Sequence, residues 1–217
     1  MDVSVADYAR ERGVSRQRAL SMIQSGQIEA RKVGRSWVID QRELGYRSAF
    51  GRPLSPRMAG ILLAAMSQED QELDAQERYF VDRYRARIAD SEDPPRLLHS
   101  WLRSRQIRVV NLAGNRSDLP ALAHDRLVVP SGISDERSGL SSAAEFEGYV
   151  GSGDFDEFVR RNLLVPSNSP NVRIHIVDKL PSRPAQLGLV IADLADWNGP
   201  REDGRVVELL RSIQWHR

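Results

Sequence analysis

The stretch that decides the fold of the N-terminal part runs from Val3 to Ile39 and reads VSVADYARERGVSRQRALSMIQSGQIEARKVGRSWVI. Apolar residues recur in its first half at intervals of three and four residues, which is the spacing of one helical face. Gly13 and Gly26 interrupt this pattern. The stretch therefore predicts two short helices joined by a tight turn, which together make a helix-turn-helix.

Each predicted helix begins at a residue that can cap it. Ser4 precedes the first helix, and Gly13 can end that helix in a left-handed conformation. Ser15 is the corresponding N-cap of the second helix, which we expect to run to about Ser25.

A β-hairpin is predicted after the second helix. Strand-like runs at residues 28–33 and 36–39 flank Gly34, and a short helix is expected from Asp40 to Leu44. We therefore expect residues 1–50 to form a winged helix-turn-helix domain, in which the hairpin is the wing.

Basic and amide side chains concentrate on two elements of this predicted domain. Recognition helices present their first turn to base edges, where arginine reads guanine and glutamine reads adenine, and basic residues on a hairpin neutralise phosphates. The candidate DNA-binding residues are Ser15, Arg16, Gln17 and Arg18 on the second helix, and Arg31, Lys32 and Arg35 on the hairpin. The alternative is an adaptor domain whose charges are only solvated.

Several short motifs in this part resemble the excisionase and MerR-type winged helix family. They are Val5-Ala-Asp-Tyr-Ala9, Val14-Ser15, Ser25-Gly26, Ile28-x-Ala30, Val33-Gly34 and Trp37-Val-Ile39. The resemblance implies that the second helix enters the major groove and that the wing lies along the backbone or in the minor groove. Excisionase-like domains also serve as protein adaptors, so that alternative stays open.

A linker from Gly45 to Ser55 follows, and it adds one more candidate. Gly51-Arg52-Pro53 matches the core of an AT-hook, an extended arm that enters a narrow minor groove, which makes Arg52 a candidate DNA contact. A plain linker is the other interpretation of this triplet.

The remainder of the chain is expected to form two further parts, so that the fold class is α+β. Residues 51–104 are predicted to be a helical connecting region, with helices over 56–66, within 69–90 and up to 102. Residues 105–217 are predicted to form a mixed α/β domain. Its expected strands are 107–112, 126–129, 146–150, 172–177 and 187–194, and its expected helices are 118–124, 154–164 and 202–213.

Two of these expectations concern burial. The continuous apolar run from Leu187 to Leu194 is typical of a buried strand. In the alternating strand around His175, we expect the histidine side chain to point to solvent.

Composition narrows the class of protein. The 217 residues include no cysteine, which excludes disulfides and thiolate metal sites. Residues 1–57 carry a net charge of +5 and residues 58–217 a net charge of −4, which favours a nucleic-acid contact at the N-terminal end. We find no signal peptide and no apolar run of roughly 18 residues, so we expect a cytoplasmic protein with no membrane partner.

Catalytic patterns are scarce. The four histidines lack metal-ligand spacing, and we find no phosphate-binding glycine loop and no nucleophile motif. Asp193 and Asp196 flank Leu194-Ala195 after the buried run Leu187–Ala192, where α/β enzymes place carboxylates, but they are a single pair. We therefore expect no enzymatic activity, no metal site and no cofactor.

Residues 45–215 resemble a group of actinobacterial regulators encoded beside nucleotidyltransferase toxins, the AbiE-type (type IV) antitoxins. The motifs are Gly51-Arg-Pro-Leu-Ser-Pro56, Val129-Pro-Ser-Gly132, Ser141-Ser-Ala-Ala144, Glu147-x-Tyr-Val150, Asn171-Val172 and Val190-Ile-Ala-Asp-Leu194. The resemblance implies a repressor of its own operon whose C-terminal domain antagonises the toxin. Its partners would be double-stranded DNA of its own promoter and the cognate toxin, and a palindromic operator would also suit a homodimer.

Two other functions stay open. A transcription factor whose second half senses a small molecule would have an apolar pocket there with convergent polar groups. A DNA-processing accessory factor would use the winged helix to deliver Asp193 or Asp196 to a metal ion.

Overall fold

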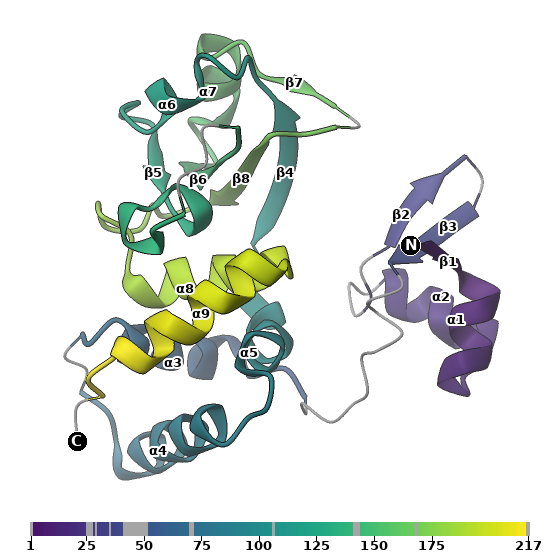
Figure 1. Cartoon of the computed structure of the whole chain (residues 1–217), viewed down its shortest axis with the longest axis vertical. Coiled ribbons are helices and arrows are strands. Elements are labelled where there is room, and N and C mark those ends of the chain that lie inside the picture. Colours follow the sequence, from purple (N-terminus) through teal and green to yellow (C-terminus); the bar gives the residue numbers. More distant parts are fainter. Residues whose placement is uncertain are drawn as a thin grey trace. The chain divides into compact units, whose positions relative to one another are not determined.

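The computed structural model describes residues 2–24, 28, 30–34, 36–40, 52–69, 72–105, 107–140, 144–167 and 169–215. The chain forms two compact units, residues 1–51 (unit 1) and residues 52–217 (unit 2), as Figure 1 shows. Both helices and sheets are present, in agreement with the α+β expectation. The helices that we expected to form a separate connecting region belong to unit 2.

Unit 1 consists of two helices and a three-stranded antiparallel sheet. The helices are α1 (Val5–Arg12) and α2 (Arg16–Gln24), and the strands, in the order β1-β3-β2, are β1 (Asp2–Ser4), β3 (Ser36–Asp40) and β2 (Ala30–Val33). Seven buried residues form its core: Val5, Tyr8, Ala9, Ala19, Ile23, Ile28 and Ile39. The sequence did not indicate β1, because its three residues precede a helix directly and become a strand only by pairing with β3.

Local signals set the helix ends of unit 1 as expected. The Oγ atom of Ser4 accepts a hydrogen bond from the backbone N–H of Asp7 at 3.1 Å, and Gly13 ends α1 in the left-handed conformation, with φ at 64°. The Oγ atom of Ser15 accepts one from the N–H of Arg18 at 3.1 Å. Asp40, the expected start of a short helix, is the last residue of β3, where it pairs with Asp2. The rest of that expected helix, residues 41–44, and the expected end of the second helix at Ser25 and Gly26 lie outside the described residues.

The centre of unit 2 is a five-stranded mixed sheet with the strand order β5-β6-β8-β4-β7. The strands are β4 (Arg108–Ala113), β5 (Val128–Pro130), β6 (Phe146–Gly151), β7 (Val165–Pro166) and β8 (Val172–Val177). Strands β6 and β8 are parallel, and the other pairs are antiparallel. Four of the five predicted strands are thereby confirmed, and β7 was not expected.

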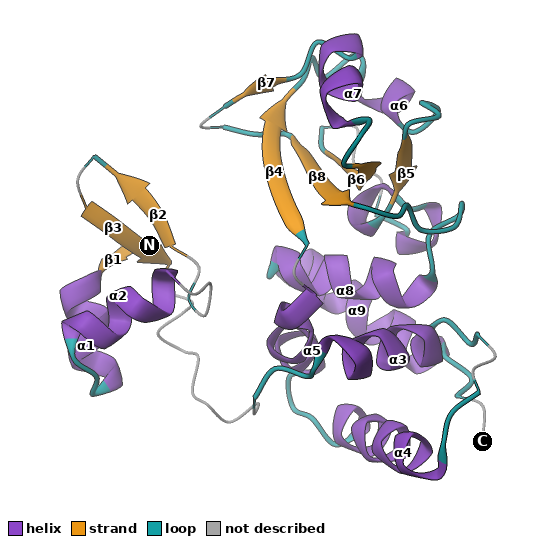
Figure 2. Ribbon diagram, turned by 180° about the vertical axis from the view of Figure 1, so that it is seen from behind, coloured by secondary structure: helices purple, strands orange, loops and turns teal. Residues whose placement is uncertain are grey.

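Helices cover both faces of this sheet. Short helices α6 (Leu119–Leu122) and α7 (Phe155–Arg161) pack on the apolar face, through Leu119, Leu122 and Phe158. On the other side lie α3 (Pro56–Met66), α4 (Ala75–Ala89), α5 (Pro94–Leu102), α8 (Leu187–Trp197) and α9 (Pro200–Ser212), as Figure 2 shows. Helix α8 packs against α3, α5, α9 and the 3-10 turn Gly132–Ser134, and its Asp193 accepts a hydrogen bond from Tyr149 of β6.

The prediction of a strand at Leu187–Leu194 was wrong, because these residues form most of α8. Residues 190–195 are all buried, since other helices and the polar side of the sheet surround α8. A helix that is buried on nearly every side has no polar face, so its sequence shows no helical period and cannot be told from a buried strand.

Gly188→Ala should destabilise unit 2, because α8 crosses α3 at this residue with almost no space between the backbones. A Cβ atom there would lie 2.0 Å from the carbonyl oxygen of Leu63. Overpacking costs about 1–3 kcal/mol. Because backbone atoms must move here, we expect the free energy of unfolding to fall by an amount in the upper part of that range. Urea unfolding followed by tryptophan fluorescence measures this loss.

Gly60→Ala is the matched control, because a Cβ atom at this exposed position of α3 meets no atom within 4 Å. Alanine is about 1 kcal/mol more favourable than glycine inside a helix, so this variant should be at least as stable as the unchanged chain. Equal losses from both substitutions would contradict the close crossing of α3 and α8.

Candidate nucleic-acid interface and buried polar network

The first turn of α2 presents polar side chains to solvent. Arg16, Gln17 and Arg18 are all exposed, whereas Ala19 is fully buried in the core of unit 1. Within the described part of the chain, the guanidinium groups of Arg16 and Arg18 have no acidic partner. Together with the N-cap Ser15, these residues form an exposed polar edge at the start of a helix.

The hairpin of unit 1 adds two exposed cations. Arg31 and Lys32 are adjacent on β2, opposite Val38 and Trp37 of β3. Because neighbouring residues of a strand point to opposite faces, the two side chains project from the two faces of the sheet. Trp37 is partly buried and packs against the core of unit 1.

The remaining two candidates are Arg35 and Arg52. Arg35 lies outside the described residues, and Arg52 is exposed but belongs to unit 2, ahead of α3. Six of the eight sequence-predicted site residues are thus described within unit 1: Ser15, Arg16, Gln17, Arg18, Arg31 and Lys32.

Unit 2 contains a feature that the sequence did not predict, a set of buried polar side chains between the sheet and the helices. The two faces of the sheet differ because side chains alternate along each strand. One face is apolar, whereas the other carries Glu147 and Tyr149 of β6 beside Arg173 and His175 of β8. We call the following residues the polar network: His99, Arg105, Ser131, Glu147, Tyr149, His175, Asp193, Asp196 and Trp197.

Glu147 is completely buried and its two carboxylate oxygens accept hydrogen bonds from three segments. Nε2 of His175 lies 2.8 Å from Oε1, while Nε1 of Trp197 donates to Oε2 at 2.7 Å. The backbone N–H of Ile133 donates to Oε2 at 3.2 Å. A buried carboxylate is tolerated only with such compensation.

Asp193 is the second fully buried carboxylate. Arg105 and Tyr149 donate to its Oδ1 at 2.9 Å each, and Ser131 donates to its Oδ2 at 2.6 Å. Arg105 also donates to Oδ2 of Asp196, so one guanidinium bridges the two aspartates of α8.

The electrostatics of the polar network follow from this pairing. Burial acts to raise the pKa of Asp196, but the charge of Arg105 and the hydrogen bond with His99 outweigh it, so that pKa lies well below its ordinary value. Burial raises the pKa of the Tyr149 hydroxyl well above its usual range, and the charge of Asp193 raises it further. Asp196 is therefore ionised and Tyr149 is a neutral donor at neutral pH.

Gly132 allows the chain to pass beside Glu147. Its φ is +52°, and a Cβ atom there would lie 1.7 Å from Oε2 of the glutamate. Only glycine provides both the left-handed backbone and the space, which lets the 3-10 turn Gly132–Ser134 pack directly on the polar network.

Two sequence-based interpretations are corrected by this geometry. His175 does not point to solvent: it is 1% exposed and stacks on Tyr149, with ring centroids 4.7 Å apart. Asp193 and Asp196 lie in a helix rather than at the end of a strand. Arg105 binds both of them, two hydroxyl groups also donate to Asp193, and His99 lies within hydrogen-bond distance of Asp196. Among the described residues, no group of three or more His, Asp or Glu side chains is placed to hold a metal ion.

The motifs of the second resemblance contained a signal for the polar network. Ser131 with Gly132, Glu147 with Tyr149, and Asp193 each occur in one of those short motifs, and in the fold they meet at one place. In the sequence, the signal for the polar network was the presence of charged residues within otherwise apolar strands and helices.

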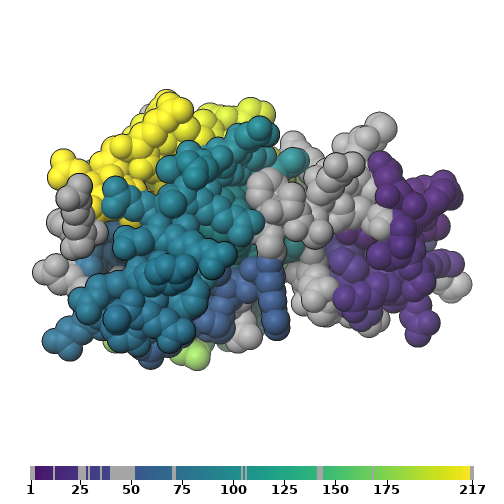
Figure 3. All heavy atoms as spheres, turned by 90° about the horizontal axis from the view of Figure 1, so that it is seen from below, coloured from purple at the N-terminus to yellow at the C-terminus, as the bar shows by residue number. Residues whose placement is uncertain are grey.

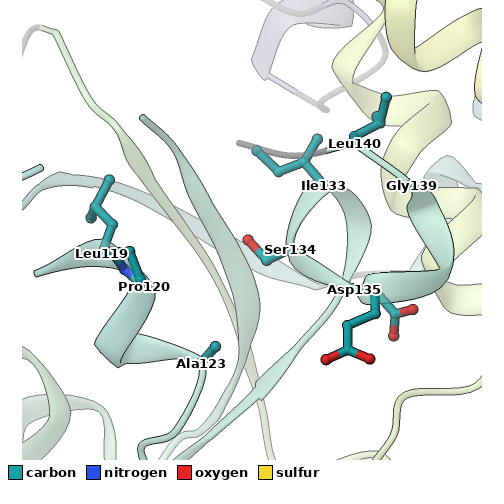
Figure 4. Close-up of a pocket in the computed structure, with 9 residues that line it drawn as sticks. Leu119, Pro120, Ala123, Ile133, Ser134, Asp135, Gly139 and Leu140 are labelled. Atoms are coloured by element: carbon teal, nitrogen blue, oxygen red, sulfur yellow. The ribbon is translucent and has the colours of Figure 1, made fainter. Parts of the chain in front are cut away.

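A pocket of about 380 Å³ opens on unit 2 beside α6. It is lined by Leu119, Pro120, Ala123, Ile133, Ser134, Asp135, Glu136, Gly139 and Leu140. In Figure 4, Leu119 and Pro120 lie on one side and Ile133 and Leu140 on the other. Its wall is connected to the polar network, because Oγ of Ser134 accepts a hydrogen bond from the N–H of Glu147 at 2.9 Å.

Comparison of the chain with protein-family models, with curated proteins and with solved structures gave no match. In the described part, no helix combines the length and the apolar character needed to cross a membrane.

Arg105→Met should destabilise unit 2 strongly at neutral pH, because it leaves Asp193 and Asp196 without their shared cation. Removing one partner of a buried ion pair costs about 3–5 kcal/mol. The loss should shrink as the pH falls toward 4, because unpaired buried carboxylates take up protons more readily in the folded chain. In the unchanged chain the pKa of Asp196 is lowered by folding, so its contribution is complete above the ordinary value of 3.8 and is lost only below it.

Urea unfolding at pH 7 and at pH 4 tests this dependence. Glu208→Gln is the control, because it removes only the exposed ion pair between Arg205 and Glu208, worth about 1 kcal/mol or less. A loss for Arg105→Met that is no larger than the control, or that grows at acid pH, would refute the role given to Arg105.

Proposed function

We propose that the chain is a sequence-specific DNA-binding transcriptional repressor, whose unit 1 is a winged helix-turn-helix that binds its own promoter in the cytoplasm. The observation that carries the proposal is the exposed first turn of α2, where Arg16, Gln17 and Arg18 project beside the N-cap Ser15. Arginine and glutamine are the side chains that form bidentate hydrogen bonds with guanine and adenine in the major groove.

The hairpin supports the same proposal. Arg31 and Lys32 supply exposed positive charge on β2, close in sequence and within the same small unit as α2. Such residues fix the register of a protein on the duplex through phosphates, without reading sequence. Arg35 is assigned the same role from its position on the predicted hairpin, and Arg52 is assigned to the minor groove from its place in the Gly51-Arg52-Pro53 triplet.

We further propose that unit 2 serves as the antitoxin part and binds a nucleotidyltransferase-type toxin. The support is the resemblance of its motifs to AbiE-type antitoxins. Because the motif residues Ser131, Glu147, Tyr149 and Asp193 are buried in the polar network, they act by holding the fold, and the toxin would contact other residues.

One specific observation favours a second candidate, a ligand-sensing transcription factor. The pocket beside α6 has the size of a small-molecule site and combines apolar walls with the acidic side chains of Asp135 and Glu136. The DNA-processing alternative has less support, because Asp193 and Asp196 are engaged by Arg105.

Arg16→Ala and Arg18→Ala should each weaken binding to the DNA upstream of the gene for this chain. Each bidentate pair with a base contributes about 1–3 kcal/mol of discrimination, which corresponds to roughly 5-fold to 150-fold in Kd. Fluorescence anisotropy with this DNA and with a scrambled duplex, at two salt concentrations, measures both affinity and discrimination.

Arg10→Ala is the matched control, since Arg10 is an exposed arginine of α1 that pairs with Asp7 of the same helix. It should leave the ratio of specific to scrambled binding unchanged. The regulator assignment would be lost if the unchanged chain bound the upstream DNA no better than the scrambled duplex, and unit 1 would then be an adaptor.

The antitoxin role predicts a separation of functions between the units. Co-expression of the chain should suppress the growth defect caused by the product of the adjacent reading frame, and the Arg16→Ala, Arg18→Ala double variant should suppress it equally well. Growth curves under separate inducible promoters measure this. Failure of the unchanged chain to suppress the defect would remove the antitoxin role and leave DNA binding unaffected.

A further inference from the structure

Unit 2 carries its own concentration of positive charge on α4. Helix α4 contains four arginines against Glu77 and Asp82, a net charge of +2, although residues 52–217 together have a net charge of −2. All four arginines, Arg78, Arg83, Arg85 and Arg87, are exposed. Four exposed arginines, with the exposed Asp82 among them, therefore lie on one helix of a unit that is otherwise slightly acidic.

The packing of α4 determines which side of it faces outward. Tyr84 lies against the buried Trp101, with ring centroids 5.1 Å apart, and Phe80 stacks on Tyr84 at 6.2 Å. Glu77 and Ile88 are also buried, so residues spaced three or four apart form the inward face. The arginines lie around the rest of the helix, and the surface of α4 is uncovered in Figure 3.

Three of these arginines have no partner within the described part of the chain. The guanidinium groups of Arg78, Arg83 and Arg85 make no ion pair and no hydrogen bond with any residue that the structure describes. By contrast, Arg57 of α3 is bound by Glu77 of α4 at 2.7 Å. The positive charge of α4 is therefore available to a ligand with negative charge spaced along its length.

We propose that α4 is a second DNA-contact surface, which binds backbone phosphates of the duplex that unit 1 reads. This inference rests on the proposed DNA-binding function. Arginine donates charge-assisted hydrogen bonds to phosphate oxygens in fixed geometry, and the exposed hydroxyl of Tyr79, a residue that is 61% exposed, can donate another. Such contacts add affinity without sequence preference.

The length of the connection between the units makes this contact attainable. Residues 41–51 join them, and a fully extended chain spans at most about 3.6 Å per residue, or roughly 40 Å. When unit 1 binds its site, unit 2 therefore stays within a few helical turns of the same duplex. Tethering of this kind raises the effective phosphate concentration at α4, so weak contacts contribute to overall affinity.

The test compares the full chain with its Arg83→Gln, Arg85→Gln double variant by anisotropy over a series of salt concentrations. Each phosphate contact contributes about 0.9 to the slope of log Kd against log salt concentration, so the slope should fall by about 1–2 in the double variant. Kd should rise by the same factor for the upstream DNA and for the scrambled duplex, with their ratio unchanged.

The matched control is the Arg116→Gln, Arg160→Gln double variant. Both arginines are exposed and without a partner among the described residues, and they lie near α6 and in α7, at the end of unit 2 opposite to α4 (Figure 1). This variant removes the same charge and should keep the slope of the unchanged chain. Melting temperatures of both variants check that the fold is intact.

The outcomes separate this inference from the function on which it rests. If Arg16→Ala abolishes discrimination while the α4 variant keeps the original slope, or loses no more slope than the control, the regulator stands and α4 does not touch DNA. The α4 contact is likewise refuted if the α4 variant loses only binding to an acidic protein partner. If the unchanged chain binds no DNA specifically, the proposed function and this inference both fail.

Discussion

The architecture of unit 2 depends on the compensation of two buried carboxylates, Glu147 and Asp193, neither of which is exposed. An ionised carboxylate at such a place costs several kcal/mol unless donors surround it. Those donors come from β6, β8, α8, the turn after β5 and Arg105, so displacing any of these segments removes a donor from a buried carboxylate. Helices α3 and α5 fold with the sheet because both pack on α8, which carries Asp193.

Sequence patterns predicted the elements whose causes are local. The caps at Ser4 and Ser15 act within three residues, and Gly13 ends its helix by its own conformation. The same reasoning failed for α8, because burial on nearly every side removes the periodicity that distinguishes a helix from a strand. Strand β1 was missed for a related reason, since three residues become a strand only through a partner distant in sequence.

The first turn of α2 and the polar network also differ in whether their causes are local in the sequence. An exposed helix start is a local property, so Arg16, Gln17 and Arg18 could be placed on one surface from the sequence alone. The polar network joins residues that are far apart in the chain, such as Arg105 and Asp193, which are separated by 88 positions. The alternation of side chains between the two faces of the strand around His175 was predicted correctly. Which of these faces is covered depends on α8, whose residues were wrongly predicted to form a strand.

The two kinds of charge in this chain respond differently to ionic strength. Exposed arginines on α2 and α4 act through water, where salt at physiological concentration screens charges beyond about 8 Å. The polar network is shielded from solvent, so its ion pairs are screened much less. Salt would therefore weaken the proposed attraction to phosphates without loosening unit 2, whose fold would remain a fixed support for the exposed arginines. The buried ion pairs of the polar network thus stabilise the fold of unit 2, whereas the exposed arginines of α2 and α4 are available to ligands.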